Sequence, residues 1–300
     1  MKTYIIFICA ALLLTSCIDF TAPKRFTEQS YYLTGMLKAG KTVDFENPII
    51  IGKTIPADGG FLNDLIVLDA EVILYELNVA DVVLDSTSLI FSFNIFDEDQ
   101  FGYIAVDTSF VIEAETKYRI KALVDTTDLI WADTTVPKII SVQPDPGYIT
   151  DPSVAIWPEM AFENVDEEHP ILVTTLDNET MNLHAEFYCL EEYDEAEYIF
   201  AIEDATYPED EYEYESGADG SPRRTTTFYI FQPNDNLINF SFYQYAFNFY
   251  GRYEVNVSSI DDNFLNYLYK PEGYNHGGII GGIGYFGSAN SHTMYTKIIE

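Results

Sequence analysis

The chain has 300 residues, with 15 Lys and Arg against 49 Asp and Glu, so its formal charge is −34 at neutral pH. This acidity argues against a nucleic-acid-binding protein, because affinity for phosphate backbones depends on basic side chains. With 47% hydrophobic residues, 23 Tyr and 21 Phe, the composition also excludes an acidic disordered chain, and the length suggests two domains with separate cores.

Residues 1–16 have the pattern of a bacterial lipoprotein signal peptide. Lys2 precedes an apolar run, residues 4–14, that is too short to cross the roughly 30 Å hydrocarbon core of a bilayer as a helix. Leu14-Thr15-Ser16-Cys17 resembles the lipobox, whose first three residues a signal peptidase recognises and whose cysteine is acylated. We therefore predict cleavage after residue 16 and a palmitate-type lipid anchor on Cys17. A buried helix with a chance cysteine is the alternative.

Cysteine usage fits this prediction. Of the 3 Cys in the chain, Cys9 leaves with the signal peptide and Cys17 carries lipid, so Cys189 alone remains as a thiol. The mature protein is therefore expected to have no internal disulfide and to depend on packing for its stability.

A β-sandwich domain is expected after a polar, aperiodic tether that covers residues 17–30. Short runs rich in β-branched and aromatic residues follow, each bounded by Gly, Asp, Asn or Pro, and no long helix separates them. They are Tyr31–Leu37, Pro48–Thr54, Ala70–Leu77, Ser88–Phe96, Tyr103–Asp107, Tyr118–Val124 and Leu129–Thr134. This pattern predicts an immunoglobulin-like or transthyretin-like sandwich over residues 31–137.

A cluster of prolines then predicts a linker, residues 138–153, followed by a second β-rich domain, residues 154–300. The helix candidate in that domain is Asp261–Tyr269, with Ser258 or Ser259 as its cap. The strand-like runs are Ile171–Leu176, Asn182–Leu190, Tyr198–Ile202, Thr225–Phe231, Asn239–Phe249 and Tyr253–Ser258. The whole chain is thus expected to be mainly β, with two sandwich-like domains and one short helix near the C-terminus.

Several short motifs resemble a family of Bacteroidota-type outer-membrane lipoproteins that carry a domain of unknown function (domain of unknown function 4249). Besides the lipobox they are residues 50–54, 69–74, 101–103, 115–118, 134–137, 264–268, Asn275 and residues 281–287. Residues 155–235 depart from the family pattern, so no site there is inherited. The resemblance implies a lipid-anchored outer-membrane protein, on the periplasmic side or the cell surface, often encoded beside TonB-dependent receptors and without an established activity.

Two motifs resemble ligand-binding loops but lack the required context. Gly282–Gly287 fits GxGxxG, yet the sequence that follows it is too short for the rest of a βαβ nucleotide-binding unit. The favoured interpretation is a glycine-rich strand or turn in which Phe286 packs and the backbone passes close to a neighbour. Asp97–Gly102 resembles the start of a calcium loop, but Phe101 and Thr108 occupy ligand positions, so a hairpin turn is favoured.

A dense acidic segment extends from Glu186 to Glu215, in which Asp and Glu recur throughout and Lys and Arg are absent. Crowded carboxylates repel one another, and a hard cation such as Ca²⁺ offsets that repulsion, although such runs are usually solvated. Calcium is therefore the only cofactor considered for this protein, and a metal site is left open.

An aromatic-rich segment follows between Asn239 and Val255. Alternate spacing favours a sheet face with Phe inside and Tyr toward the rim. The competing interpretation is a ligand surface formed by Tyr243, Tyr245, Tyr250 and Tyr253.

Catalytic patterns are weak. The four histidines are scattered, no GxSxG or HExxH motif is present, and His184 with Cys189 supplies too few ligands for zinc. We therefore expect a non-enzymatic binding or assembly partner at the cell envelope, accessory to a TonB-dependent receptor, without nucleotide or nucleic acid. A carboxylate-dependent glycoside hydrolase and a purely structural surface protein are the alternatives.

Overall fold

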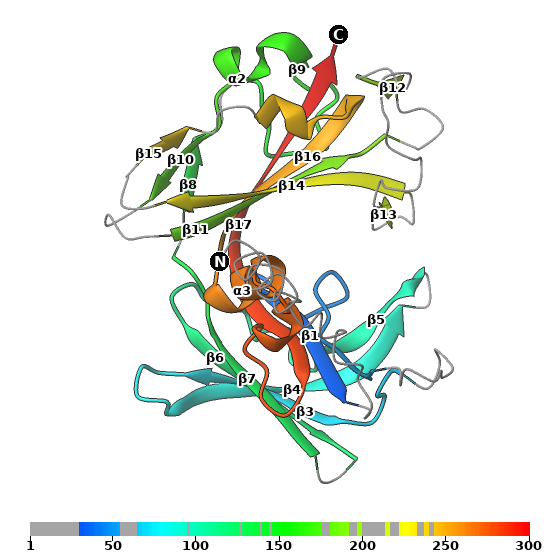
Figure 1. Cartoon of the computed structure of the whole chain (residues 1–300), viewed down its shortest axis with the longest axis vertical. Coiled ribbons are helices and arrows are strands. Elements are labelled where there is room, and N and C mark those ends of the chain that lie inside the picture. The colour runs from blue at the N-terminus through cyan, green and yellow to red at the C-terminus, as the bar shows by residue number, and fades with distance from the viewer. Residues whose placement is uncertain are drawn as a thin grey trace, which may run out of the picture.

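The fold is known from a computed structural model, which describes residues 30–54, 65–94, 97–125, 128–138, 140–143, 146–175, 181–191, 197–199, 214–216, 222–232, 237–239 and 243–300. Within these residues the chain is mainly β, with packed sheets and a short helix near the C-terminus, which confirms the predicted fold class. Figure 1 shows two β-rich parts, one above the other, connected along strand β17.

The lower part in Figure 1 contains an antiparallel five-stranded sheet in the order β5-β4-β3-β6-β7. Alternate residues of β6, from Tyr118 to Val124, are buried while the residues between them are half-buried, as the period of two in a strand requires. The strand bounds are β3 (Glu71–Leu77), β4 (Val83–Asn94), β5 (Asp97–Ala105), β6 (Lys117–Val124) and β7 (Asp128–Thr135).

Strands β4 and β5 form the predicted hairpin, with Asn94 opposite Asp97. The position predicted for the turn was wrong, because Asp97–Gly102 belongs to strand β5. Aromatic residues explain this extension: Phe101 lies opposite Phe93, and Tyr103 lies opposite Phe91. Cross-strand aromatic pairs stabilise a ladder and outweigh the turn preference of the acidic residues.

The second and largest sheet has nine strands, seven of which follow the order β13-β14-β11-β16-β17-β1-β2, while β12 pairs with β16 and β9 with β17. Their bounds are β1 (Tyr31–Lys38), β2 (Ile50–Lys53), β9 (Glu159–Ala161), β11 (Met181–Cys189), β12 (Glu197–Tyr198), β13 (Tyr214–Ser216), β14 (Pro222–Gln232), β16 (Phe249–Ile260) and β17 (Ile283–Ile299).

Strand β17 extends through both parts of the molecule. Its first half pairs in parallel with β1, from Tyr32 opposite Ile283 to Lys38 opposite Ala289. Its second half pairs in antiparallel fashion with β16. The first and last strands of the fold therefore lie side by side, as the blue and red ribbons show in Figure 1.

The glycine-rich segment before and within β17 brings backbones into close contact. Gly284 has a φ of +106°, and a Cβ added there would lie 2.2 Å from the carbonyl oxygen of Leu33 on β1. Gly287 faces helix α3, where an added Cβ would lie 2.8 Å from Cβ of Phe264. Phe286 between them is fully buried. The predicted glycine-rich strand, in which Phe286 packs and the backbone passes close to a neighbour, is confirmed.

Two hydrophobic cores lie in the two parts. The first core gathers side chains from β1 to β7 together with Phe286 of β17, and the second gathers side chains from residues 140–298. The residues expected to form a linker contribute to the second core, since Ile140, Val142 and Tyr148 are buried in it. They include β8 (Ile140–Gln143), which forms a three-stranded sheet with β10 (Leu172–Thr175) and β15 (Leu237–Asn239).

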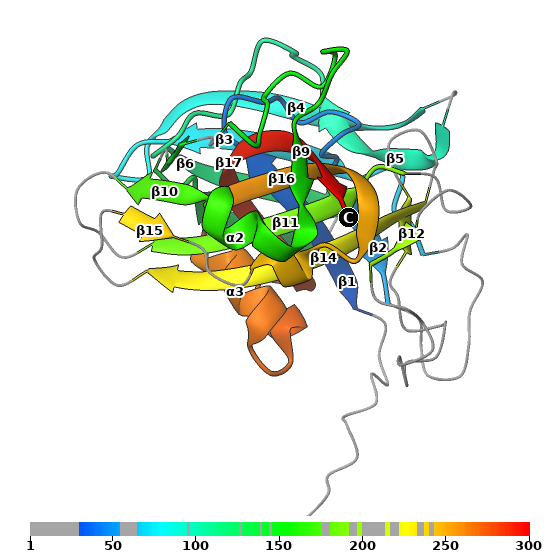
Figure 2. The ribbon, with the colours of Figure 1, turned by 90° about the horizontal axis from the view of Figure 1, so that it is seen from above.

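Helices in the described residues are short. They are η2 (Phe162–Asn164), α2 (Val165–Glu168), η5 (Tyr243–Ala246), α3 (Asp262–Tyr269) and η6 (Gly273–Asn275). Figure 2 shows α3 projecting from one side of the molecule, beside the large sheet. None of the helices found in the described ranges is long and apolar enough to span a bilayer.

Candidate functional site

The start of helix α3 connects three strands. Asp261 caps the helix, because its carboxylate accepts a hydrogen bond from the Phe264 amide at 3.1 Å. The side-chain amide of Asn263 donates to the carbonyl oxygens of Asp133 on β7 and Phe286 on β17, at 2.7 and 2.8 Å. Asp262 accepts from the Asn182 amide of β11 at 3.1 Å. The helix thereby fixes β7, β11 and β17 relative to one another.

The predicted helix cap was wrong. Ser258 and Ser259 lie inside strand β16, where the Ser258 hydroxyl lies 2.7 Å from that of Ser291 and Ser259 donates to the carbonyl of Lys138. The strand continues to Ile260 because it stays paired with both neighbouring strands, so the first residue free to cap the helix is Asp261.

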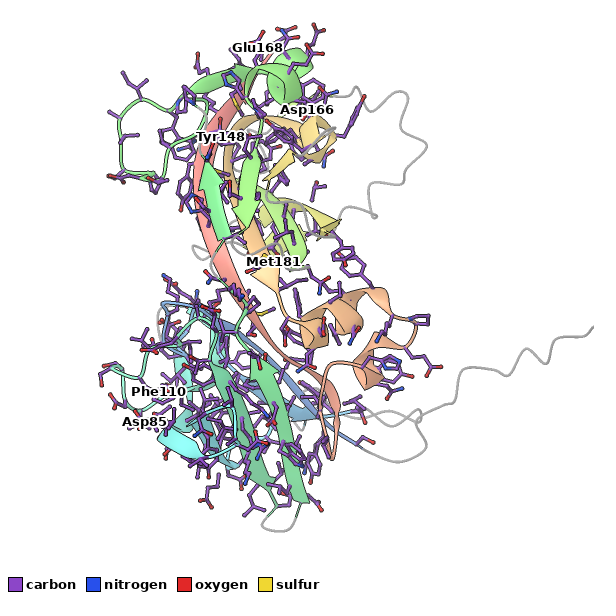
Figure 3. The ribbon with its side chains drawn as sticks, turned by 90° about the vertical axis from the view of Figure 1, so that its left-hand side faces the viewer. Asp85, Phe110, Tyr148, Asp166, Glu168 and Met181 are labelled. Atoms are coloured by element: carbon purple, nitrogen blue, oxygen red, sulfur yellow. The ribbon has the colours of Figure 1, made fainter. Side chains whose placement is uncertain are left out.

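A cavity of about 570 Å³ lies at this point, and we call it the junction cavity. Figure 3 shows one of its lining residues, Met181, at the level where the two parts meet. The lining residues are Glu115, Asp133, Thr134, Thr135, Val136, Pro137, Lys138, Met181, Asn182, Ser259, Ile260, Asp261, Asp262 and Asn263. It is large enough for a small ligand and mixes apolar and polar groups, as binding sites do.

A row of oxygen atoms that begins in the wall of the cavity, at Thr134 and Asp261, and continues to the buried Ser288 links the two parts. The hydroxyl of Thr134 lies 2.7 Å from both Oδ2 of Asp261 and the hydroxyl of Ser288, which in turn donates to the carbonyl of Thr135 at 3.1 Å. These three contacts need three protons, and the two hydroxyl groups supply two. When Asp261 is ionised, Thr134 donates to its carboxylate and Ser288 can donate to only one of its two partners, so all three contacts are hydrogen-bonded together only when Asp261 is protonated.

Burial favours the protonated form of Asp261. Burial raises the pKa of Asp261, and the hydrogen bonds from Thr134 and from nearby backbone amides offset only part of the rise. A carboxyl group whose pKa is raised in the fold stabilises it when protonated. That contribution is complete below the pKa of the unfolded chain and is lost as the pH rises through the folded-state pKa.

Asp261→Asn is expected to become more stable relative to the unaltered protein as the pH rises above 3.8, the ordinary pKa of an Asp carboxyl group, through the raised pKa of Asp261. The amide can still accept from Phe264 and donates to Thr134 at every pH, so it preserves a contact worth about 1 kcal/mol that the carboxylate loses. Urea unfolding of both proteins at each pH measures this difference, in which all other titrating groups cancel. A stability difference independent of pH would show that folding does not raise the pKa of Asp261.

The other acidic side chains of the junction cavity are held by contacts within the fold. Asp133 receives two hydrogen bonds from Arg119, at 2.5 and 2.6 Å, and an ion pair from Lys117 at 3.0 Å. Burial raises the pKa of Asp133, but these cations outweigh it and hold the pKa below its ordinary value. Glu115 lies 4.0 Å from the ammonium group of Lys138. No two of these carboxyl groups are therefore free to act together as a general acid and a general base.

The four tyrosines considered as a ligand surface do not share one environment. Tyr243 and Tyr253 are 2% and 1% exposed and lie in the second core, whereas Tyr245 is 55% exposed and Tyr250 is half-buried. The expected alternation of Phe inside and Tyr outside is wrong here, because Tyr243–Ala246 is a 3-10 turn and not part of a strand.

The buried tyrosines find hydrogen-bond partners inside the core. The hydroxyl of Tyr253 accepts from the Phe249 amide and donates to the Phe249 carbonyl, at 3.0 and 3.1 Å. The hydroxyl of Tyr243 donates to the carbonyls of Val165 and His169. Both side chains therefore act in packing, and they are not available as a binding surface.

His184 and Cys189 cannot share a metal ion, because they lie five residues apart on strand β11 and so face opposite sides of the sheet. Cys189 belongs to the second core, while His184 packs edge-on against Phe264 of helix α3. Burial lowers the pKa of His184 to about 4, so its ring is neutral at physiological pH. Within the described ranges, no group of three or more His, Cys, Asp or Glu side chains is arranged to hold a metal.

Two predicted features lie mostly or entirely outside the described residues. Cys17 and its recognition residues Leu14, Thr15 and Ser16 precede residue 30, where the description begins. Of the acidic segment 186–215, only residues 186–191, 197–199 and 214–215 are described. The lipid anchor and calcium binding by that segment both remain predictions.

Comparison with protein-family models gives no match, and comparison with curated protein sequences gives no significant similarity.

Proposed function

We propose that the chain is a cell-envelope lipoprotein, anchored to the outer membrane through acylated Cys17, that binds a partner or ligand without transforming it. The observation that carries this proposal is the junction cavity, whose volume suits a ligand but whose acidic side chains are all engaged. Asp133 is neutralised by Arg119 and Lys117, Asp261 caps α3, and Asp262 is held by Asn182. A glycoside hydrolase needs a pair of carboxyl groups free to exchange protons with substrate and water.

The partner proposed for this binding protein is a TonB-dependent receptor of the outer membrane, as the family resemblance implies. The formal charge of −34 supports a protein partner over nucleic acid or a strongly anionic lipid surface. The junction cavity is the proposed contact, because it lies where the two parts of the fold meet and is open to solvent.

Cys17→Ala is expected to abolish incorporation of labelled palmitate and to release the protein from the membrane fraction. The physical reason is that acyl chains supply the apolar area that holds the chain on the bilayer. Metabolic labelling followed by membrane fractionation measures both effects. The matched control is Cys9→Ala, which changes a cysteine of the signal peptide and leaves the lipobox complete. Label that persists in Cys17→Ala would contradict the lipid anchor.

Thr135→Trp is expected to reduce recovery of the receptor at least tenfold when the protein is purified in mild detergent. Thr135 is exposed and lines the junction cavity, so an indole there fills the space with little effect on the cores. Ser86→Trp, on an exposed position of β4, serves as the control. Mass spectrometry identifies the recovered partner, and absence of any TonB-dependent receptor from the unaltered sample would count against the proposal.

A further inference from the structure

Helix α3 carries more apolar surface than the fold covers. Five of its eight residues are Phe, Leu or Tyr, yet none of its side chains is buried. Its inner side touches the large sheet, where the Phe264 and Tyr267 rings lie 5.3 and 4.5 Å from the ring of Tyr285. Its last turn is partly open to solvent, with Leu268 42% and Tyr269 47% exposed, while the Tyr269 ring also lies 4.9 Å from the ring of Tyr229 on β14. A helix with this distribution of side chains ordinarily has an apolar partner on its open side.

The same side of the molecule contains the start of strand β1. Figure 2 shows helix α3 on the same side of the molecule as the start of strand β1. Tyr31 and Leu129 line a second cavity of about 490 Å³ there. Leu129 is 48% exposed, and Ile280, whose backbone pairs with Trp131, is 50% exposed. Together, Tyr31, Leu129, Leu268, Tyr269 and Ile280 define what we call the tether face.

Chain length favours a membrane as the occupant of the tether face. Residues 18–30 connect Cys17 to Tyr31, and they span about 50 Å even at full extension. A fold of 300 residues also measures about 50 Å across. The opposite side of the protein therefore reaches the anchoring membrane only when the connecting residues are almost fully extended. The tether face reaches it without such extension.

Charge and side-chain chemistry at helix α3 and the loop after it agree with this occupant; beside Tyr31 lie two acids, Asp125, which pairs with Lys53, and Asp128. The segment from Asp262 to Ile280 contains two acids, Asp262 and Glu272, and one lysine, Lys270, in a chain that otherwise has a large acidic excess. Tyrosine has an apolar ring and a polar hydroxyl, and it favours the boundary between hydrocarbon and headgroups. An amphipathic helix with low charge lies readily in that boundary.

We propose that the tether face rests on the membrane that holds the lipid anchor, with Leu268 and Tyr269 of α3 in the headgroup region of an uncharged lipid surface. This inference rests on the proposed lipid anchor, and it adds a fixed orientation of the protein on the bilayer. That orientation presents the side opposite α3 to the aqueous space.

The test uses the full lipidated chain in phosphatidylcholine vesicles that contain a brominated quencher lipid. A fluorescent label is attached at Lys270→Cys, beside Tyr269, or at Val79→Cys, a fully exposed apolar position on the β3–β4 hairpin. Cys189 is buried and remains unlabelled under native conditions. Quenching at position 270 is expected to exceed quenching at position 79 at least twofold. A double substitution in the Lys270→Cys protein, Leu268→Asp with Tyr269→Asp, is expected to lower the quenching at position 270 to the level measured at position 79.

Flotation of the vesicles tests the lipid anchor separately from the orientation of the protein on the bilayer. Protein that does not float with the vesicles contradicts the lipid anchor, and hence the proposed function. Protein that floats but shows equal quenching at positions 270 and 79 overturns the orientation alone. Unchanged quenching in the doubly substituted protein also overturns it, because Leu268 and Tyr269 would then not be the contact. Because the substituted positions are exposed, the melting temperatures of these variants are expected to stay near that of the unaltered protein. A measured melting temperature in that range excludes unfolding as the cause of a change in quenching.

Discussion

Phe286→Ala is expected to lower the free energy of unfolding by about 3–5 kcal/mol, as for other fully buried phenylalanines. The ring comes from the last strand of the fold but lies in the first core, with Leu33, Leu37 and Ile49. Truncation removes the apolar area and leaves a cavity in a region fixed by β1 on one side and α3 on the other. Urea unfolding followed by tryptophan fluorescence measures the loss.

The control for this substitution is Phe93→Ala, because Phe93 is 63% exposed and its loss is expected to cost less than about 1 kcal/mol.

A second comparison tests whether the two cores unfold together. Met294 lies in the second core on the same strand as Phe286. If β17 couples the cores, Phe286→Ala and Met294→Ala lower the midpoint of one common transition. Two transitions, each shifted by one substitution only, would show that the cores unfold independently.

Gly284→Ala is expected to destabilise the protein by at least about 3 kcal/mol. Its backbone φ of +106° is unfavourable for residues with a Cβ, and the added methyl group would lie 2.2 Å from the carbonyl oxygen of Leu33. Because that oxygen belongs to the parallel ladder of β1 and β17, relief of the collision requires separation of the two strands. Thermal unfolding and the loss of slowly exchanging amides in β1 measure the effect.

Gly40→Ala is the matched control for this second substitution. Gly40 also has a positive φ, +76°, but an added Cβ there meets no atom within 4 Å. Both variants place a Cβ on a residue with positive φ. The difference between their losses of unfolding free energy therefore measures the cost of the steric collision at Gly284. Equal losses of stability would mean that β1 moves aside at little cost.

Much of the secondary structure was predictable because alternation along a strand is a local property. The runs predicted at Tyr31–Leu37, Tyr118–Val124 and Leu129–Thr134 match β1, β6 and β7 to within one residue at each end. Helix Asp261–Tyr269 was also predicted to within one residue, since an acidic start followed by a clustered apolar face is a local signal.

Long-range packing explains the wrong predictions. The aromatic run 239–249 has the composition of a strand, but residues 243–246 turn so that Tyr243 reaches the carbonyls of Val165 and His169. Those partners precede Tyr243 by 78 and 74 positions in the sequence. Local propensity carries no information about such partners, and therefore the predicted alternation placed Tyr243 and Tyr253 toward the rim of a sheet face, whereas both lie inside the core.

The candidate site shows the same limit. Thr134, Asp261 and Ser288 look ordinary in sequence, where Thr134 precedes the other two by 127 and 154 positions, yet their oxygen atoms form one hydrogen-bonded row. The pair Asp261-Asp262 before an apolar run indicated the first turn of a helix, whereas the cap was predicted at Ser258 or Ser259 and lies at Asp261. Nothing local indicated that Asn263 would hold the backbones of β7 and β17.

The sequence by itself determined the mainly β character, most strand positions and the C-terminal helix, because each depends on residues within a few positions of one another. Only the tertiary structure decided that β17 joins β1 and enters both cores, and that a cavity forms where α3 begins. These features depend on which distant segments pack together. Packing is selected by the free energy of the whole fold and not by local preference.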